Sequence, residues 1–519
     1  MRRGYGRWKA ENEPCRIATP GFRSTVQAMK RLNLPFRTSI LTLVLAAAAP
    51  SSAESPAGLR ERVEAKLEEV GRGTRFGLVV ASEDGRELIA LEPDARFIPA
   101  SNTKMFTTAA AYSAIPGLDR PDSEGGAAVR LEAAGRGVVD AILEGRGDAR
   151  LSSRPDCVAN CLAALADAVA RATRTVRDVV GDDSLFPDQR WSPGMSWNNI
   201  PTRSGTAASA LSLDDNELPL RVHPAAPGKP PRLELLPYYQ VDNRAVTVAP
   251  GGPAALAFDR LPGSRRLRLT GTIAAGAEPE LLRLGIDDPA DYAAWRFKAL
   301  LEARGVTVTG QVAVRHRPLG PADDPEIRGG APPARPPRSE PLAQLIPPPL
   351  AEDLEAINKA SQNLHSELLL RRLGRIGGTG SIADGLAVVR AMLAGAGIAR
   401  SGYDFSDGSG MSTYNRVAPR AMVAFLRWAS AQPWGLAWRS GLPVGGVDGT
   451  LARRFKGTAL EGRVFAKTGT LNATNALSGY MMARSGRTLL FSAYANDVPD
   501  GVEATAAIDS ALVMIAEAN

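Results

Sequence analysis

The chain has 519 residues, which is too long for one compact domain and predicts two to four. Its hydrophobic fraction of 44% is ordinary for globular protein. The formal net charge of +7 comes from residues 1–53, which carry nine Lys and Arg against two Asp and Glu, so the rest of the chain is neutral overall. This balance excludes a strongly basic surface, and we expect no nucleic acid as partner.

Residues 1–53 have the features of a secretory leader preceded by extra sequence. Basic residues lead into the short apolar run 40–49, small residues at 51–53 fit a cleavage site, and Met29 is a candidate for the true start. A short membrane anchor is the alternative, although the run is short for a stable span. We therefore expect an exported, periplasmic mature chain with no transmembrane anchor.

Two cysteines remain after the leader, Cys157 and Cys161. In an oxidising compartment they could form a local disulfide, but a spacing of four on a helix requires some unwinding. Two free thiols are the alternative. No histidine lies nearby, so the pair makes no convincing metal site, and we expect neither a metal nor a cofactor.

The first segment after the leader predicts a helix followed by a β-hairpin. Residues 59–70 place their charges on one face of a helix. Residues 76–81 and 87–91 predict strands on either side of Asp84-Gly85, a dipeptide typical of hairpin turns.

The stretch PASNTK at residues 99–104 follows the hairpin and precedes an apolar run compatible with a buried helix. Ser101 and Lys104 are three positions apart, so they share one helix face. A serine needs an adjacent base to act as a nucleophile, and a lysine among apolar neighbours can lose its proton and serve as that base. The first helical turn also offers free N–H groups to an oxyanion. A helix cap followed by a surface lysine is the alternative reading.

Residues 122–317 have a different sequence pattern from the segments before and after them, and we interpret them as one or two inserted β-rich domains. Short alternating stretches broken by Gly, Pro or Asp predict strands there, and two helices interrupt them. The predicted strands are 130–132, 138–143, 265–271 and 306–314, and the predicted helices are 157–172 and 290–304. This insert either shapes the entrance to the site or has only a structural role. Residues 318–344 are rich in proline and predict an extended linker.

The last part of the chain returns to long helices and strands. The predicted helices begin near 351 and cover 364–373, 384–396, 419–431 and 503–516, and the predicted strands are 464–466, 476–482 and 488–494. Together with the front of the chain these elements predict an α+β fold, with helices covering one antiparallel sheet. We assign residues 54–121 and 345–519 to this discontinuous domain.

Three short motifs stand in order along the chain: Ser101-x-x-Lys104, Ser361-x-Asn363, and Lys467-Thr468-Gly469 followed by Thr470. Each alone is a weak signal. Together, at a helix start, an inter-helix loop and a strand end, they resemble the active-site set of penicillin-binding proteins and serine β-lactamases.

Lys104 and Ser361 are separated by 256 residues, and this long separation limits the families that the chain resembles. Few β-lactamases place so much chain there, whereas the class C low-molecular-mass penicillin-binding proteins do. The chain therefore resembles the DacB-type D-alanyl-D-alanine carboxypeptidase/endopeptidase family (peptidase family S13). The stretches 407–416 and 442–451 share the resemblance, and Gln362 departs from the aspartate that is common in the second motif.

The resemblance implies a role for each motif residue. Ser101 would be the acylated nucleophile and Lys104 its general base. Ser361 would relay a proton to the leaving amine, with Lys467 close by. Which lysine accepts the first proton stays open, because the two charges are coupled.

The remaining motif residues would bind substrate. Asn363 would hydrogen-bond the substrate amide, and Thr468, Gly469 and Thr470 would hold its terminal carboxylate. The backbone N–H groups of Ser101 and Thr470 would form the oxyanion hole.

The implied activity is that of a serine-type D-Ala-D-Ala carboxypeptidase, with DD-endopeptidase activity left open, acting on peptidoglycan stem peptides during cell-wall metabolism. β-Lactam antibiotics would be covalent inhibitors. A β-lactamase and a non-catalytic peptidoglycan-binding protein are the alternatives. His365 could be proposed as a base for the second motif, but Lys104 already supplies one, so we interpret this histidine as a packing or surface residue.

Overall fold

The computed structural model describes residues 56–135, 137–335 and 339–519. The predicted leader at residues 1–53 lies outside the described residues. Within these ranges, no helix has both the length and the apolar character needed to span a membrane.

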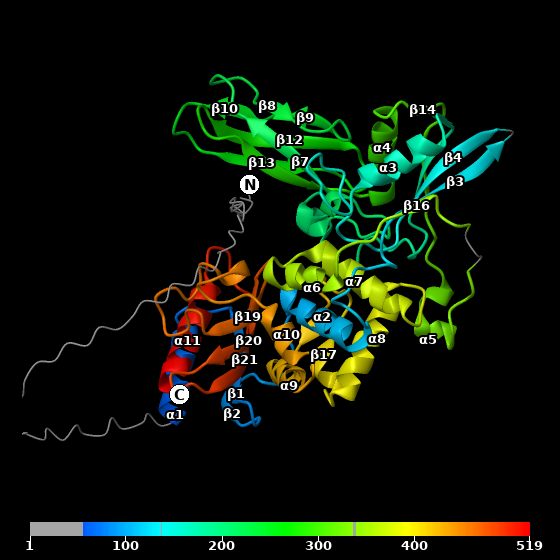
Figure 1. The fold of residues 1–519 in the computed structure, drawn as a ribbon. Helices are drawn as coiled ribbons and strands as arrows, with labels where there is room; N and C mark the ends of the chain where they lie inside the picture. Colours follow the sequence, from blue (N-terminus) through cyan, green and yellow to red (C-terminus); the bar gives the residue numbers. More distant parts are fainter. Residues whose placement is uncertain (1–55, 136, 336–338) are drawn as a thin grey trace, which may run out of the picture. The chain divides into compact units, whose positions relative to one another are not determined.

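A five-stranded antiparallel sheet joins the front of the described chain to its back (Figure 1). Its strand order is β19-β20-β21-β1-β2, so the predicted hairpin adds to three strands made some 400 residues later along the sequence, β1 pairing with β21. The strands are β1 (Arg75–Ser82), β2 (Glu87–Leu91), β19 (Val464–Leu471), β20 (Thr474–Met482) and β21 (Thr488–Asn496). The single antiparallel sheet predicted from the sequence is confirmed.

Helices cover both faces of this sheet, because alternate side chains of each strand point to opposite sides. Leu78 and Val80 of β1 belong to a core with α1 (Pro56–Glu68) and α11 (Ala504–Ala518). Val79 and Ala81 belong to a second core on the other face. The helices of that second core are α2 (Thr103–Ala114), α6 (Leu350–Lys359), α7 (Asn363–Arg375), α8 (Ile382–Gly395), α9 (Pro419–Ser430) and α10 (Gly435–Ser440).

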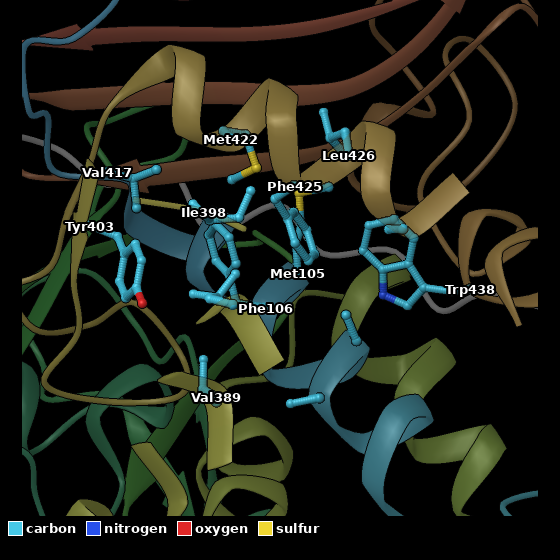
Figure 2. Packing of buried hydrophobic residues seen from close by; sticks show 14 of the residues in the cluster. Met105, Phe106, Val389, Ile398, Tyr403, Val417, Met422, Phe425, Leu426 and Trp438 are labelled. Atoms are coloured by element: carbon cyan, nitrogen blue, oxygen red, sulfur yellow. The ribbon is translucent and has the colours of Figure 1, made fainter. Parts of the chain in front are cut away.

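Aromatic packing around helix α2 fixes its position in the second core (Figure 2). The ring of Phe106 lies 4.4 Å from that of Phe425 on α9 and 4.9 Å from that of Phe405, measured between centroids. Trp438 of α10 is buried beside them and donates its indole N–H to Thr108 Oγ1 at 3.0 Å. Helix α2, which follows Ser101, is therefore held rigidly from several sides.

Residues 127–306 contain a hydrophobic core of their own. A mixed sheet of order β15-β6-β4-β3-β16, a three-stranded sheet β13-β7-β8, and a sheet in which β12 pairs with β9, β10 and β11 surround it, together with the pair β14-β5. The strands are β3 (Ala128–Gly135), β4 (Val138–Glu144), β5 (Thr175–Val176), β6 (Val179–Asp182), β7 (Glu217–His223), β8 (Arg232–Glu234), β9 (Gln240–Asn243), β10 (Val246–Val248), β11 (Ala255–Asp259), β12 (Arg266–Ala274), β13 (Glu280–Gly285), β14 (Thr307–Val308), β15 (Val312–Arg315) and β16 (Ala343–Gln344). The helices are α3 (Leu162–Ala172) and α4 (Pro289–Glu302).

Three local predictions between residues 157 and 344 differ from the structure. The helix expected from residue 157 begins only at Leu162, because Cys157 and Cys161 form a disulfide in the loop before it, with Cα atoms 5.8 Å apart. The single strand expected at 306–314 is two short strands, β14 and β15, that belong to different sheets.

The third difference concerns residues 318–344, which are not simply extended. They include the short helix α5 (Pro325–Arg328), and the strand β16 that pairs with β3. One further two-stranded ribbon, β17 (Tyr403–Asp404) with β18 (Arg416–Val417), flanks the loop 407–415. This loop contacts Lys104 in the candidate active site.

Candidate active site

Ser101 lies in the 3₁₀ turn η1 (Ala100–Asn102), directly before helix α2, and not in the first turn of the α-helix itself. The residue before it, Ala100, has a left-handed φ of +46°, which is strained for a residue with a Cβ. Two glycines allow neighbouring segments to approach this turn. A Cβ on Gly410 would lie 1.9 Å from the Ala100 oxygen, and one on Gly469 would lie 2.7 Å from the Pro99 oxygen.

Lys104 is fully buried beneath Ser101, as the three-residue spacing predicts. Its Nζ lies 3.0 Å from Ser101 Oγ, 2.6 Å from Asn363 Oδ1 and 2.6 Å from the carbonyl oxygen of Ser409. Burial lowers the pKa of Lys104 to about 7, against the opposing effect of nearby carboxylates. Near neutral pH this amine is therefore present in both of its protonation states.

The three oxygens around Lys104 Nζ can form hydrogen bonds with both its ammonium form and its neutral amine form. The ammonium form donates one hydrogen to each oxygen. The neutral amine can donate its two remaining hydrogens to Asn363 and Ser409, which leaves its lone pair directed at the hydroxyl of Ser101. The geometry therefore suits abstraction of the serine proton.

The second motif occupies the corner between helices α6 and α7. Ser361 sits in the corner with a left-handed φ of +59°, and Asn363 begins α7. The amide of Asn363 has a defined orientation, because its Oδ1 accepts from Lys104 while its Nδ2 donates to the carbonyl of Ser204 at 2.9 Å.

The third motif lies within strand β19, at the edge of the sheet, and not beyond its end. Lys467 is fully buried and donates from Nζ to Ser361 Oγ at 2.9 Å, while its carbonyl accepts from Asn102 Nδ2 at 2.8 Å. Burial, and then repulsion by Lys104, hold the pKa of Lys467 well below its ordinary value. Five sequence-predicted residues, Ser101, Lys104, Ser361, Asn363 and Lys467, are thus linked in one cluster.

The other three predicted residues follow along β19. Thr468 is partly exposed and donates its hydroxyl to Thr450 Oγ1 at 2.7 Å. Gly469 provides the close approach to the serine turn described above. The side chain of Thr470 is exposed and shares a strand face with Thr468. This face offers hydroxyl groups to a ligand in solvent.

His365 does not contact either serine of the motifs. Its Nε2 lies 2.9 Å from Asp215 Oδ1, and its Nδ1 lies 3.3 Å from Asp353 Oδ1. Although burial opposes the charge, the two carboxylates raise the pKa of His365 to about 9. The imidazolium is an ion-pair partner that connects α7 to α6 and to the loop around residue 215, as a packing role implies.

Several residues at the site were given no role in the sequence analysis, although 407–416 was among the stretches that share the resemblance. Ser409 supplies the carbonyl that holds Lys104, and Glu367 accepts the N–H groups of Gly408 and Ser409 at 3.1 and 2.9 Å. Burial and the neighbouring Glu367 raise the pKa of Asp407 to about 6. The available signal was the spacing of four between Asn363 and Glu367, which places both on one face once the helix predicted at 364–373 is extended by one residue to Asn363, where α7 begins.

The arrangement has the parts needed for acyl transfer without histidine or metal. An alcohol is paired with a buried amine of lowered pKa, a second alcohol is paired with a second buried amine, and a strand edge with hydroxyl groups runs beside them. Two ammonium groups so close together oppose each other, so the site favours loss of at least one proton.

Comparisons with known proteins agree with this chemistry. The profile of the D-Ala-D-Ala carboxypeptidase 3 (S13) family matches residues 59–518. The chain is 35% identical to a D-alanyl-D-alanine carboxypeptidase of Actinomadura sp. (strain R39) over 504 residues, which cover 92% of this chain and 89% of that protein. It is 24% identical to the D-alanyl-D-alanine carboxypeptidase DacB of Haemophilus influenzae, over 83% of this chain and 87% of that one.

Among solved structures, the chain resembles penicillin-binding protein 4 (dacB) from Haemophilus influenzae with a TM-score of 0.72. The match covers 87% of this chain and 97% of that one at 21% identity, so it shows the shared fold. A second structure of that protein, in complex with a novel β-lactam, has a TM-score of 0.67.

Proposed function

The chain belongs to the D-Ala-D-Ala carboxypeptidase 3 (S13) family, and we propose that Ser101 is the nucleophile of this serine-type carboxypeptidase. The observation that carries the proposal is the contact of Lys104 Nζ with both Ser101 Oγ and Asn363 Oδ1, which joins the first two motifs across 259 residues of sequence. The substrate class is the D-Ala-D-Ala terminus of peptidoglycan stem peptides.

Acylation proceeds in two steps at these residues. Ser101 Oγ attacks the carbonyl carbon of the terminal peptide bond while its proton passes to the neutral amine of Lys104. The electron pair of the carbonyl moves onto its oxygen, and the N–H groups of Ser101 and Thr470 stabilise the resulting oxyanion.

The tetrahedral intermediate then collapses. The carbonyl re-forms, the C–N bond breaks, and the departing D-alanine amine takes a proton from the Ser361 hydroxyl, which the ammonium of Lys467 replaces. Water then attacks the ester carbonyl and gives a proton through Ser361 to the neutral amine of Lys467, while Ser101 Oγ leaves and takes its proton back from the ammonium of Lys104. The shortened peptide is released, and both lysines return to their starting protonation states. Lys104 is the favoured first base, because its Nζ is the one that contacts Ser101.

Substrate is held along the edge strand. Asn363 donates to the substrate amide, while Thr468 and Thr470, with the charge of Lys467, bind the terminal carboxylate, and Gly469 keeps the strand close to the serine turn. β-Lactams mimic the scissile bond and acylate the same serine. A cross-link peptide presents the same D-alanyl carbonyl, so we include DD-endopeptidase activity in the proposal.

We also propose that residues 122–317 form the inserted domains of this enzyme and that residues 1–53 direct its export to the periplasm. Contacts such as that of Asn363 with Ser204 support a role of the insert beside the site, because Ser204 lies within the inserted residues.

The test is covalent labelling of the purified protein by a fluorescent penicillin. Wild type should be labelled at Ser101 and release D-alanine from a stem-peptide mimic, and Ser101→Ala should do neither. Labelling that persists in Ser101→Ala would refute the assignment. Rapid steady-state turnover of a chromogenic cephalosporin would instead favour the β-lactamase alternative.

A further inference from the structure

One face of helix α7 carries three residues at spacings of four, Asn363, Glu367 and Arg371. Asn363 contacts Lys104 directly. Arg371 is buried and pairs with Glu367, its Nη1 lying 2.8 Å from Oε2. Glu367 is thus the middle member of a polar stripe that begins at the catalytic cluster, and the acylation steps above give it no role.

The other oxygen of Glu367 holds the loop on which Lys104 rests. Its Oε1 accepts the N–H groups of Gly408 at 3.1 Å and Ser409 at 2.9 Å. The carbonyl of Ser409 accepts from Lys104 Nζ, and the carbonyl of Gly408 accepts from Thr107 Oγ1 on the same helix as Lys104. Glu367 therefore fixes two successive residues whose carbonyls hold helix α2 and its lysine.

Glu367 also contributes charge to the site. Burial opposes the positive charge of Lys104, and the carboxylates of Asp407 and Glu367 favour it. The charge of Lys104 in turn opposes a positive charge on Lys467. Asp407 is buried in the same loop and accepts the N–H of Gly410 at 2.9 Å. In a site with little water, such charges act strongly on one another.

We propose that Glu367 is a positioning residue for the acylation reaction, which fixes the Gly408–Ser409 loop under Lys104 and supplies negative charge that favours the ammonium form of that lysine. The inference rests on the proposed function, because it requires that Lys104 receives the proton of Ser101. Together with Asp407, Glu367 raises the pH at which the neutral amine of Lys104 becomes available, although it touches neither substrate nor nucleophile.

The charge role and a purely structural role predict different results. If Glu367 only supported the loop, its substitution would lower the acylation rate at every pH. If it also holds the proton on Lys104, removing its charge releases the amine at lower pH. The acid limb of the acylation profile then moves toward lower pH.

Glu367→Gln separates these cases, because glutamine keeps an oxygen for both N–H groups and removes the charge. The second-order rate constant for acylation by a fluorescent penicillin is measured on the full chain from about pH 5 to about pH 9. We expect the acid limb to move to lower pH by about 0.5 to 1 pH unit. Relative to its own plateau, the variant should then react about three- to tenfold faster than wild type on the acid side.

The matched control is Glu217→Gln, since Glu217 is a buried glutamate in an ion pair with Arg283 but belongs to the insert strand β7. Its acid limb should coincide with that of wild type. If the acid limb of the Glu367→Gln profile stays at the pH of wild type or moves to higher pH, the inference is overturned. This holds whatever rate constant the variant reaches at its plateau.

A second variant guards against misfolding of the first, which leaves the buried guanidinium of Arg371 without its carboxylate. Glu367→Gln with Arg371→Met removes both charges, and its limb should move in the same direction by a smaller amount. An unmoved limb in this folded double variant also overturns the inference. Failure of wild type to be acylated would defeat the proposed function instead, so the two failures are distinguishable.

Discussion

Asn363→Ala tests the hydrogen bond between Lys104 of the first motif and Asn363 of the second. The amide oxygen of Asn363 lies 2.6 Å from Nζ of Lys104, and Lys104 is fully buried, so water has little access to replace the lost acceptor. A hydrogen bond to a charged group contributes about 1.5–3 kcal/mol, and about 1.4 kcal/mol corresponds to a factor of ten in rate. We therefore expect acylation by a fluorescent penicillin to slow by about 10- to 150-fold.

The assay is stopped-flow labelling, with circular dichroism melts to establish that each variant is folded. Asn358→Ala is the matched control, because Asn358 is a buried asparagine of the preceding helix α6 whose Nδ2 donates to Thr108 Oγ1 at 3.3 Å, away from the serine. It should lose stability while its acylation rate changes little. A folded Asn363→Ala protein that is acylated within about threefold of wild type would show that this contact does not support the base.

Three further predictions concern stability and substrate selection. The pKa of His365 in the folded protein, about 9, lies above its ordinary 6.5. Its ion pairs should therefore add about 3 kcal/mol to the free energy of unfolding, in full below pH 6.5 and progressively less as the pH rises through 9. The unfolding free energies of wild type and His365→Gln should therefore converge in alkaline solution, and a gap independent of pH would contradict this. Phe106→Ala should cost about 3–5 kcal/mol in chemical unfolding, since its ring packs in the core shown in Figure 2, and a loss below about 1 kcal/mol would be inconsistent with that packing. Thr450→Val removes the hydroxyl that orients Thr468 and should lower kcat/KM about two- to tenfold for a peptide ending in a free carboxylate, with less effect on its amidated analogue, whereas equal losses would argue against carboxylate binding there.

The central sheet and its helices could be predicted from the sequence because each element carries a local signal. The hairpin has alternating residues around Asp84-Gly85, and the later strands alternate in the same way. Their combination into one sheet followed from the helices at both ends of the chain, which need a common surface to cover. The cluster of Ser101, Lys104, Asn363, Ser361 and Lys467 was predicted as a set only because the three motifs occur in a known order.

Other features depend on long-range contacts that leave little trace in the sequence. The left-handed conformation of Ser361 is imposed by the corner between two helices, and serine gives no sign of it. The contact of Asn363 with the carbonyl of Ser204 uses a backbone group, which every residue has. The split of 306–314 into two strands reflects pairing with different partners, β5 and β6, and an alternating pattern does not identify the partner.

The pairing of β1 with β21 has a consequence for biosynthesis. A ribosome releases the turn of Ser101 long before the edge strand that carries Lys467, because Lys467 lies 365 residues after Asn102 of that turn, and the two strands beside it follow later still. Until they arrive, the hairpin at the front has no neighbours to complete its sheet, while residues 127–306 already contain the full set of side chains for their own core. A nascent chain that stops before these strands therefore contains Ser101 without the buried amine of Lys467 and without three of the five strands of the sheet.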